Sequence, residues 1–182
     1  MKSIVLAAYA FLTAAPLCAQ AFQSRVVVDA VLGGGARSEY ADGVWYRGNA
    51  TPYGRLALTL QVPVQSRVAA LLTLERAGNI ETGDHLADCP PAPDGSCRLY
   101  FPPVAGYSLG LGARGLLLRR AELGVGSGVS LTGPHGHYFR ADVGLQATRH
   151  LAAVAGLDYR VVRRSDNARL WWRPVFFGAR FR

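Results

Sequence analysis

The stretch from Phe139 to Ala147 alternates apolar and polar side chains without a break, and its polar half contains Arg140 and Asp142. Successive side chains of a β-strand point to opposite faces of the sheet. The stretch therefore predicts a strand with one apolar face and one ionic face. The fold of the chain depends on which of these two faces is enclosed.

The same alternation recurs in short, glycine-rich runs along the chain. After the first residues there is no apolar stretch long enough for a helix to cross a membrane. Eight runs are predicted to be strands, at 25–34, 53–62, 67–77, 104–113, 116–128, 137–147, 151–162 and 170–181. An even number of short alternating strands is typical of a closed antiparallel barrel.

The connections between these runs are predicted to alternate in length. The short set is 63–66, 114–115 and 148–150, and the longer set is 35–52, 78–103, 129–136 and 163–169. Short turns at one end and long loops at the other are typical of outer-membrane barrels. The sequence thus predicts an all-β fold, an eight-stranded antiparallel up-and-down transmembrane β-barrel.

The polar faces of the eight runs carry charges of both signs. They are Arg25, Asp29, Arg55, Glu75, Arg120, Glu122, Arg140, Asp142, Asp158, Arg160 and Arg180. A barrel of eight strands has room inside for side chains but not for a wide water channel. Because buried charges are stable only when they are paired and hydrogen-bonded, we expect an enclosed ion network, with glycines making space for it.

The N-terminus has the features of a secretory signal peptide. Lys2 precedes an apolar run, Ile4 to Leu17, that is too short for a membrane span and is followed by small residues. Cleavage after Ala19 or Ala21 is predicted. Residues 1–21 are then the signal peptide and residues 22–182 the barrel domain.

Two cysteines remain after such cleavage, Cys89 and Cys97, in a segment rich in proline. In an exported chain this spacing favours a local disulfide. A metal site formed with His85, Asp84 and Asp88 is the alternative, although the spacing is not that of a zinc site.

The formal net charge is +8, and every base except Lys2 is arginine. The arginines are dispersed along the strands instead of forming one basic run. Guanidinium groups bind phosphate in a bidentate manner. We therefore expect lipopolysaccharide or phospholipid headgroups as partners, and no nucleic acid.

In signal peptide, strand pattern and loop pattern the chain resembles the small eight-stranded outer-membrane barrels typified by the OmpA transmembrane domain and OmpX. The stretch from Leu170 to Arg182 looks like the C-terminal strand by which such proteins are recognised by the barrel-assembly machinery, except that Arg182 follows Phe181. The resemblance implies a location in the bacterial outer membrane. Interfacial aromatic girdles are expected from Tyr107, Tyr138, Tyr159, Trp171, Trp172 and Phe181.

No catalytic constellation stands out, and no cofactor is predicted. Some small outer-membrane barrels modify lipid A, which requires a nucleophile, a base and an orienting group. Ser127 or Ser130 near His137 is the best candidate here, but no nucleophile elbow is present. His135 and His150 are expected to be exposed polar residues.

The sequence favours a non-enzymatic outer-membrane barrel that anchors exposed loops for envelope integrity, adhesion or contact with an extracellular ligand. The candidate loop contacts are Tyr40, Trp45, Tyr46 and Arg47, which have the aromatic and arginine character of binding surfaces. The alternatives are a lipid A-modifying enzyme, a narrow channel, and a soluble carrier whose apolar face points inward.

Overall fold

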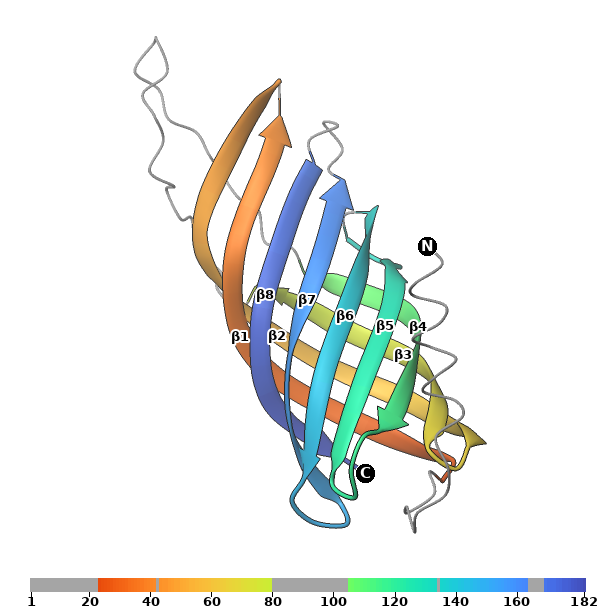
Figure 1. Ribbon diagram of the computed structural model, residues 1–182. Helices are drawn as coiled ribbons and strands as arrows, with labels where there is room; N and C mark the ends of the chain where they lie inside the picture. The colour runs from red at the N-terminus through yellow and green to blue at the C-terminus, as the bar shows by residue number, and fades with distance from the viewer. Residues whose placement is uncertain (1–22, 42, 80–104, 134, 164–168) are drawn as a thin grey trace, which may run out of the picture.

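The computed structural model describes residues 23–41, 43–79, 105–133, 135–163 and 169–182. They form a closed antiparallel barrel in which each strand pairs with the next and β8 pairs with β1 (Figure 1). The strands are β1 (Arg25–Ala41), β2 (Val44–Gln65), β3 (Val68–Asn79), β4 (Gly106–Leu116), β5 (Ala121–Ser130), β6 (His135–Gln146), β7 (Leu151–Arg163) and β8 (Arg169–Phe181). The predicted eight-stranded up-and-down barrel is confirmed. No helix among the described residues is long and apolar enough to cross a membrane.

The strands are tilted relative to the barrel axis, as Figure 1 shows. A path of paired residues that leaves β1 at Arg37 and passes once around the barrel returns to β1 at Val27. The path is Arg37, Trp172, Arg160, Tyr138, Gly128, Gly110, Thr73, Thr59 and Val27. Such a stagger accompanies tilted strands in any closed barrel. It also decides which interior side chains face each other across the lumen.

The apolar face of the barrel points outward and the ionic face points inward. Phe139 and Leu145 are 55% and 58% exposed, whereas Arg140 and Asp142 are 9% and 6% exposed. Leu111 and Phe177, both 68% exposed, show the same inversion on β4 and β8. A protein that folds in water encloses such residues, so the polarity of this barrel is reversed.

The turn between β4 and β5 differs from the prediction. Gly115 lies within β4, where it pairs with Leu123, and the chain reverses over residues 117–120. The predicted turn at Arg114-Gly115 is therefore wrong, because this glycine pairs on both sides within the sheet. Arg114 belongs to the interior, and Arg120 is an exposed turn residue instead of an interior one.

Residues 35–41 and 44–52 belong to paired strands instead of the predicted loop. β1 and β2 remain paired up to Ala41 and Val44, and Gly43 has a φ of 80°. The dipeptide Asp42-Gly43 is a strong signal for a tight hairpin, and glycine accepts the positive φ without steric cost. The hairpin continues the barrel wall beyond most other strands (Figure 1).

The remaining described connections also differ from the prediction, because those between β2 and β3 and between β5 and β6 are shorter and the β6–β7 turn is one residue longer. The chain between β5 and β6 spans residues 131–134 in place of 129–136, and the turn between β6 and β7 spans 147–150. Connection length therefore does not simply alternate. The predicted signal peptide (1–21), the segment with the predicted Cys89–Cys97 disulfide (80–104) and residues 164–168 lie outside the described residues.

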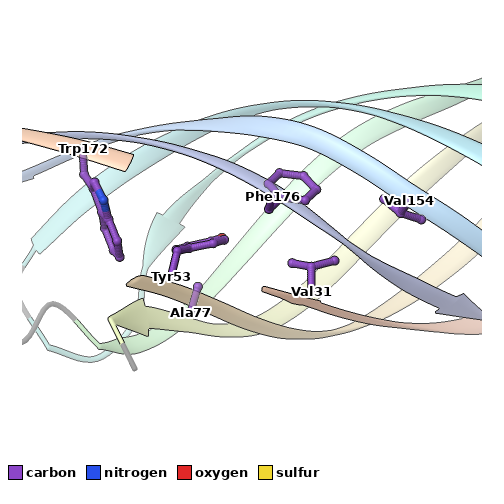
Figure 2. Close-up of a cluster of buried hydrophobic side chains, with 6 residues drawn as sticks. All are labelled: Val31, Tyr53, Ala77, Val154, Trp172 and Phe176. Carbon is purple, nitrogen blue, oxygen red and sulfur yellow. The ribbon is translucent and has the colours of Figure 1, made fainter. Parts of the chain in front are cut away.

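Part of the interior is apolar, which the sequence did not indicate. Trp172 and Tyr53 are fully buried, with their rings edge to face at 5.2 Å between centroids (Figure 2). The cluster consists of Val31, Tyr53, Ala77, Val154, Trp172 and Phe176. Trp172 and Tyr138 (3% exposed) are thus interior residues, and their expected place in an aromatic girdle is wrong. Both share strand parity with interior arginines, which places them inside.

Candidate functional site

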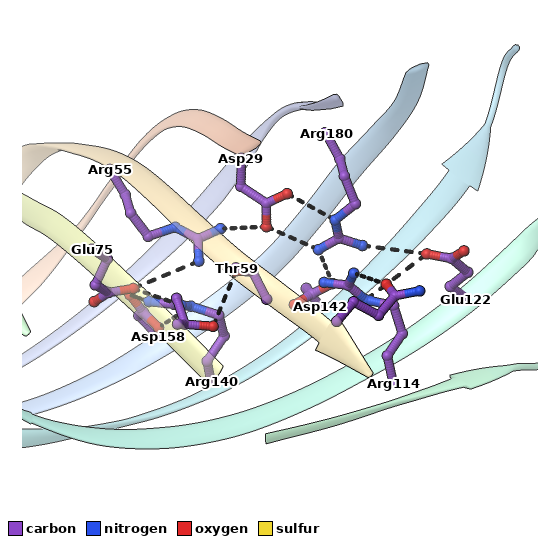
Figure 3. Close-up of polar contacts among 12 residues, drawn as sticks. Asp29, Arg55, Thr59, Glu75, Arg114, Glu122, Arg140, Asp142, Asp158 and Arg180 are labelled. Carbon is purple, nitrogen blue, oxygen red and sulfur yellow. Dashed lines mark hydrogen bonds and ion pairs between the residues drawn. The ribbon is translucent and has the colours of Figure 1, made fainter. Parts of the chain in front are cut away.

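The barrel interior contains two clusters of ionic side chains. We call them the Glu75 cluster (Tyr53, Glu75, Arg140, Asp158 and Arg160) and the Arg180 cluster (Asp29, Arg114, Glu122, Asp142 and Arg180). The carboxylates and guanidiniums of both clusters are almost completely buried. Figure 3 shows members of both clusters, with Glu75, Arg140 and Asp158 in one group and the Arg180 cluster beside it.

In the Glu75 cluster two arginines share two carboxylates. Arg140 donates from Nε and Nη2 to the two oxygens of Asp158, at 2.8 and 3.0 Å, and its Nη1 lies 2.7 Å from Glu75 Oε2. Arg160 contacts Glu75 Oε1 at 2.5 Å and Asp158 Oδ2 at 3.0 Å. The Tyr53 hydroxyl also donates to Asp158. Bidentate guanidinium–carboxylate pairs of this kind fix the geometry as well as compensating the charge.

In the Arg180 cluster one arginine links its own strand to three others. Arg180 donates from Nε and Nη2 to Asp29 at 2.8 and 3.0 Å, and Nη2 also donates to Asp142 at 2.8 Å. Its Nη1 lies 3.5 Å from Glu122 Oε2. The single guanidinium therefore connects β8 to β1, β6 and β5.

Arg114 extends the Arg180 cluster toward β2, and Arg55 lies between the two clusters. Arg114 donates from Nη1 to Gln61 at 3.0 Å and lies 3.8 Å from Glu122. Arg55 approaches Asp29 at 3.7 Å and Glu75 at 3.8 Å, as the dashed lines of Figure 3 indicate. The ionic interior is thus one connected network.

Most of the residues predicted for the network lie inside the barrel, together with three buried charged residues that were not predicted, Arg37, Glu39 and Arg114. Arg25 is half-buried, Arg120 is exposed in the β4–β5 turn, and the other nine predicted residues are buried. Arg114, 2% exposed, was missed because the turn was misplaced. Arg182 also contacts Glu122. The parity of Ser108, Gly110 and Gly112 in β4 would have found Arg114 if the strand had been extended.

Glycines on β5 and β6 provide the space for these long side chains. A Cβ atom at Gly124 would lie 2.8 Å from Asp142 Oδ2, and one at Gly144 would lie 3.0 Å from Arg180 Nη1. Neither distance is compatible with unshifted side chains. At Gly124 and Gly144 the barrel wall has no side chain, and the side chains of Asp142 and Arg180 occupy the space next to it.

The outer surface of the described residues carries charge of one sign only. Every Asp and Glu among them is buried, and these are Asp29, Glu39, Glu75, Glu122, Asp142 and Asp158. The exposed arginines form two groups. Arg76, Arg163, Arg169 and Arg173 are near the end that carries the β1–β2 hairpin, and Arg119, Arg120 and Arg149 are in the turns at the other end. We call these ends the hairpin end and the turn end.

The catalytic candidates are not assembled into a reactive group. His137 and Ser127 are exposed, and no hydrogen bond joins His137 to Ser127 or Ser130 within the part of the chain that the structure describes. His135 is exposed, and His150 Nδ1 lies 3.2 Å from the carbonyl oxygen of Arg182. Among the described residues no cluster of His, Cys, Asp and Glu could hold a metal ion.

Tyr40 and Trp45 are exposed, at 39% and 61%, on paired positions of the β1–β2 hairpin. Their rings lie 5.3 Å apart, and the Trp45 ring lies 4.7 Å from that of Trp171 on β8. The structure therefore brings two of the four predicted loop contacts together with a residue from the other end of the chain. The side chains of Tyr46 and Arg47 lie outside the described part.

No protein-family model matches the chain, and no curated protein matches it. A solved structure of Neisserial surface protein A is similar with 14% identity and a TM-score of 0.46, over 86% of this chain and 96% of that one. The attachment invasion locus protein Ail of Yersinia pestis is similar with 12% identity and a TM-score of 0.46, over 88% of this chain and 100% of that one. Ail in complex with the heparin analogue sucrose octasulfate gives 12% identity and a TM-score of 0.40, over 86% and 99%. By its own strand pairing, the chain is a closed eight-stranded antiparallel β-barrel with an ionic interior and an apolar exterior.

Proposed function

We propose that this protein is an integral β-barrel of the bacterial outer membrane, without catalytic activity, that anchors exposed segments at the cell surface. The observation that carries the proposal is the reversed polarity of the barrel. Leu56, Leu111 and Phe177 are more than half exposed on the outside, while Asp158 and Arg180 are buried inside. An outer surface made of such exposed apolar side chains is unfavourable in water and is the normal exterior of a barrel in lipid.

The filled interior supports an anchoring role over a channel. The two ionic clusters and the cluster around Trp172 occupy the lumen. Two small cavities, both lined in part by Tyr138, are present among the described residues. Removing one partner of a buried ion pair is costly, so the network resists opening. We infer that the barrel serves as a rigid support and not as a route for solutes.

The chemistry of the described residues supports a non-enzymatic function. Acyl transfer needs a nucleophile in contact with a base, and the base must be oriented by a third group. Every described carboxylate lies inside the barrel, away from the exposed His137. A lipid A-modifying activity therefore has no assembled site in this part of the chain.

The exposed segment that the barrel presents is the β1–β2 hairpin with Tyr40 and Trp45. Exposed aromatic side chains of this kind are enriched in interaction surfaces, which supports a role in adhesion or surface contact. The outward-facing positions of β8, including Phe177 and Phe181, support recognition of this strand by the barrel-assembly machinery.

The location is tested by a substitution on the lipid-facing surface. In Leu111→Trp, the added indole should face the hydrocarbon, so brominated lipid chains should quench its fluorescence beyond the quenching seen in the wild type. The folded barrel should require detergent and should migrate faster on gels when it is not boiled. A protein that stays monodisperse in water without detergent would contradict the proposal. Lipid A mass spectra that change with expression of the protein would contradict the absence of catalysis.

A further inference from the structure

The outward face of β8 changes character along its length. From the hairpin end, its outward side chains are Arg169, Trp171, Arg173, Val175, Phe177, Ala179 and Phe181. Val175 and Phe177 are 64% and 68% exposed and belong to the apolar band. If the band lies in lipid, the bilayer surface crosses β8 between Val175 and Arg173. Arg173, Trp171 and Arg169 then lie at successively greater heights in the headgroup layer.

Aromatic side chains from β1 and β2 complete a patch around these residues. Tyr40 pairs with Arg169 across β1 and β8, and Trp45 pairs with Tyr40 across β1 and β2. The rings of Tyr40, Trp45 and Trp171 form a continuous series with centroids 5.3 and 4.7 Å apart. We call these three residues, with Arg169 and Arg173, the β8 rim.

The arginines of the β8 rim have donors available for a ligand. No ion pair involves Arg169 or Arg173 within the described ranges of the chain, where every carboxylate is enclosed by the barrel. The Arg173 guanidinium lies 5.8 Å from the centre of the Tyr159 ring on β7. An aromatic face orients a guanidinium and leaves its N–H groups free to bind an anion.

We propose that the β8 rim binds the phosphorylated saccharide headgroup of a glycolipid in the surrounding leaflet. This inference rests on the proposed membrane location. Arg169 and Arg173 are four residues apart on one strand, which separates their Cα atoms by about 13 Å. The indole of Trp171 between them and the neighbouring indole of Trp45 offer flat apolar surfaces to sugar rings, while the two guanidiniums bind phosphate groups. A glycerophospholipid has a phosphate but no ring to contact the indoles.

The turn end provides a matched comparison. Arg119 and Arg120 are also exposed arginines, but among the described residues the stacked rings of Tyr40, Trp45 and Trp171 lie at the opposite end of the barrel. They provide the same charge without the stacking surface. If the β8 rim binds the headgroup as proposed, it should prefer lipids that carry saccharide rings, and the arginines of the turn end should show no such preference.

The test is native mass spectrometry of the full-length protein in detergent, titrated with diphosphoryl lipid A, dephosphorylated lipid A or phosphatidylglycerol. The wild type should bind diphosphoryl lipid A most tightly. The double variant Arg169→Gln/Arg173→Gln should lose about tenfold or more in affinity, as expected when two charge-assisted donors are removed. The variant Trp171→Leu should weaken binding of lipid A but leave binding of phosphatidylglycerol unchanged. The control Arg119→Gln/Arg120→Gln should bind lipid A like the wild type.

Three outcomes would overturn the inference. These are equal affinity for lipid A and phosphatidylglycerol, an equal loss in the turn-end control, and no loss in the β8 rim variant. Each sample is first shown to be a folded barrel by its heat-dependent migration. If the barrel inserts into bilayers but shows no lipid A preference, the inference fails and the proposed membrane location stands. If the protein does not enter bilayers, the proposed function itself fails.

Discussion

Arg140 donates two hydrogen bonds to the carboxylate of Asp158, from a neighbouring strand, at a position where both side chains are almost completely shielded from solvent. Glu75 compensates the rest of the positive charge from the opposite side of the lumen. The pair shows how this barrel keeps ionic groups in its centre. Arg140, Asp158 and Glu75 each contact at least two groups of opposite charge.

Asp158→Ala should strongly destabilise the barrel, because it leaves Arg140 and Arg160 short of one carboxylate. We expect a loss of about 3–5 kcal/mol in the free energy of unfolding, measured by urea titration in lipid vesicles. The neighbouring outward residue gives the control. Leu157→Ala should cost less than about 1 kcal/mol, since lipid replaces the lost contacts. Similar losses for the two variants would contradict the assigned polarity.

Arg180→Ala should be equally damaging, because this guanidinium contacts both Asp29 and Asp142. The expected loss is again about 3–5 kcal/mol in the same urea titration. Arg120→Ala removes the same side chain from the exposed β4–β5 turn, and it should change stability by less than about 0.5 kcal/mol. A large loss of stability in Arg120→Ala would indicate that Arg120 belongs to the interior network after all.

Gly124→Ala should test how tightly the interior is packed. The added methyl would lie 2.8 and 2.9 Å from the two carboxylate oxygens of Asp142. We expect a loss of about 1–3 kcal/mol from overpacking, seen as a lower midpoint for the heat-dependent gel shift. Gly34→Ala on β1 is the control, since its nearest neighbour would be the Thr51 carbonyl oxygen at 3.4 Å. A neutral result at Gly124 would show that the ionic side chains move aside freely.

The extended β1–β2 hairpin should be visible by hydrogen exchange. Residues 37–40 of β1 pair with both β2 and β8, so their amides should exchange slowly. The β4–β5 turn at 117–120 should exchange quickly in the same experiment. Mass spectrometry of peptides from deuterated protein measures both. Fast exchange over 37–40 would favour the open loop that the sequence first indicated.

Strand parity was sufficient to predict the barrel and the direction of most of its side chains. Phe139, Arg140 and Asp142 could be assigned to their faces because one period covers the whole strand. Strand parity gives a wrong assignment of side chains to faces where the end of a strand is predicted too early in the sequence. Gly115 was interpreted as a turn residue, which removed Arg114 from the interior and placed Arg120 there.

The partners within the network could not be predicted from single strands. Arg180 meets Asp29 because β8 closes on β1 with a particular stagger, and Arg140 reaches Glu75 across the lumen. These contacts depend on strand tilt and register, which local patterns do not specify. The burial of Trp172 among Tyr53 and Phe176 depends on the same closure. In the sequence, the only indication that Trp172 is buried is that it shares strand parity with the interior residue Arg180.

The bond between Arg180 and Asp29 joins the eighth strand to the first, and this has a consequence for how the protein enters its membrane. A sheet that still lacks β8 leaves Asp29 and Asp142 without their shared counter-ion, so hydrocarbon would strongly disfavour it. Hairpins added one at a time would each carry uncompensated charge into the bilayer. Stable insertion therefore has to coincide with the pairing of β8 and β1. Closure of the barrel is then the step after which insertion is no longer reversed.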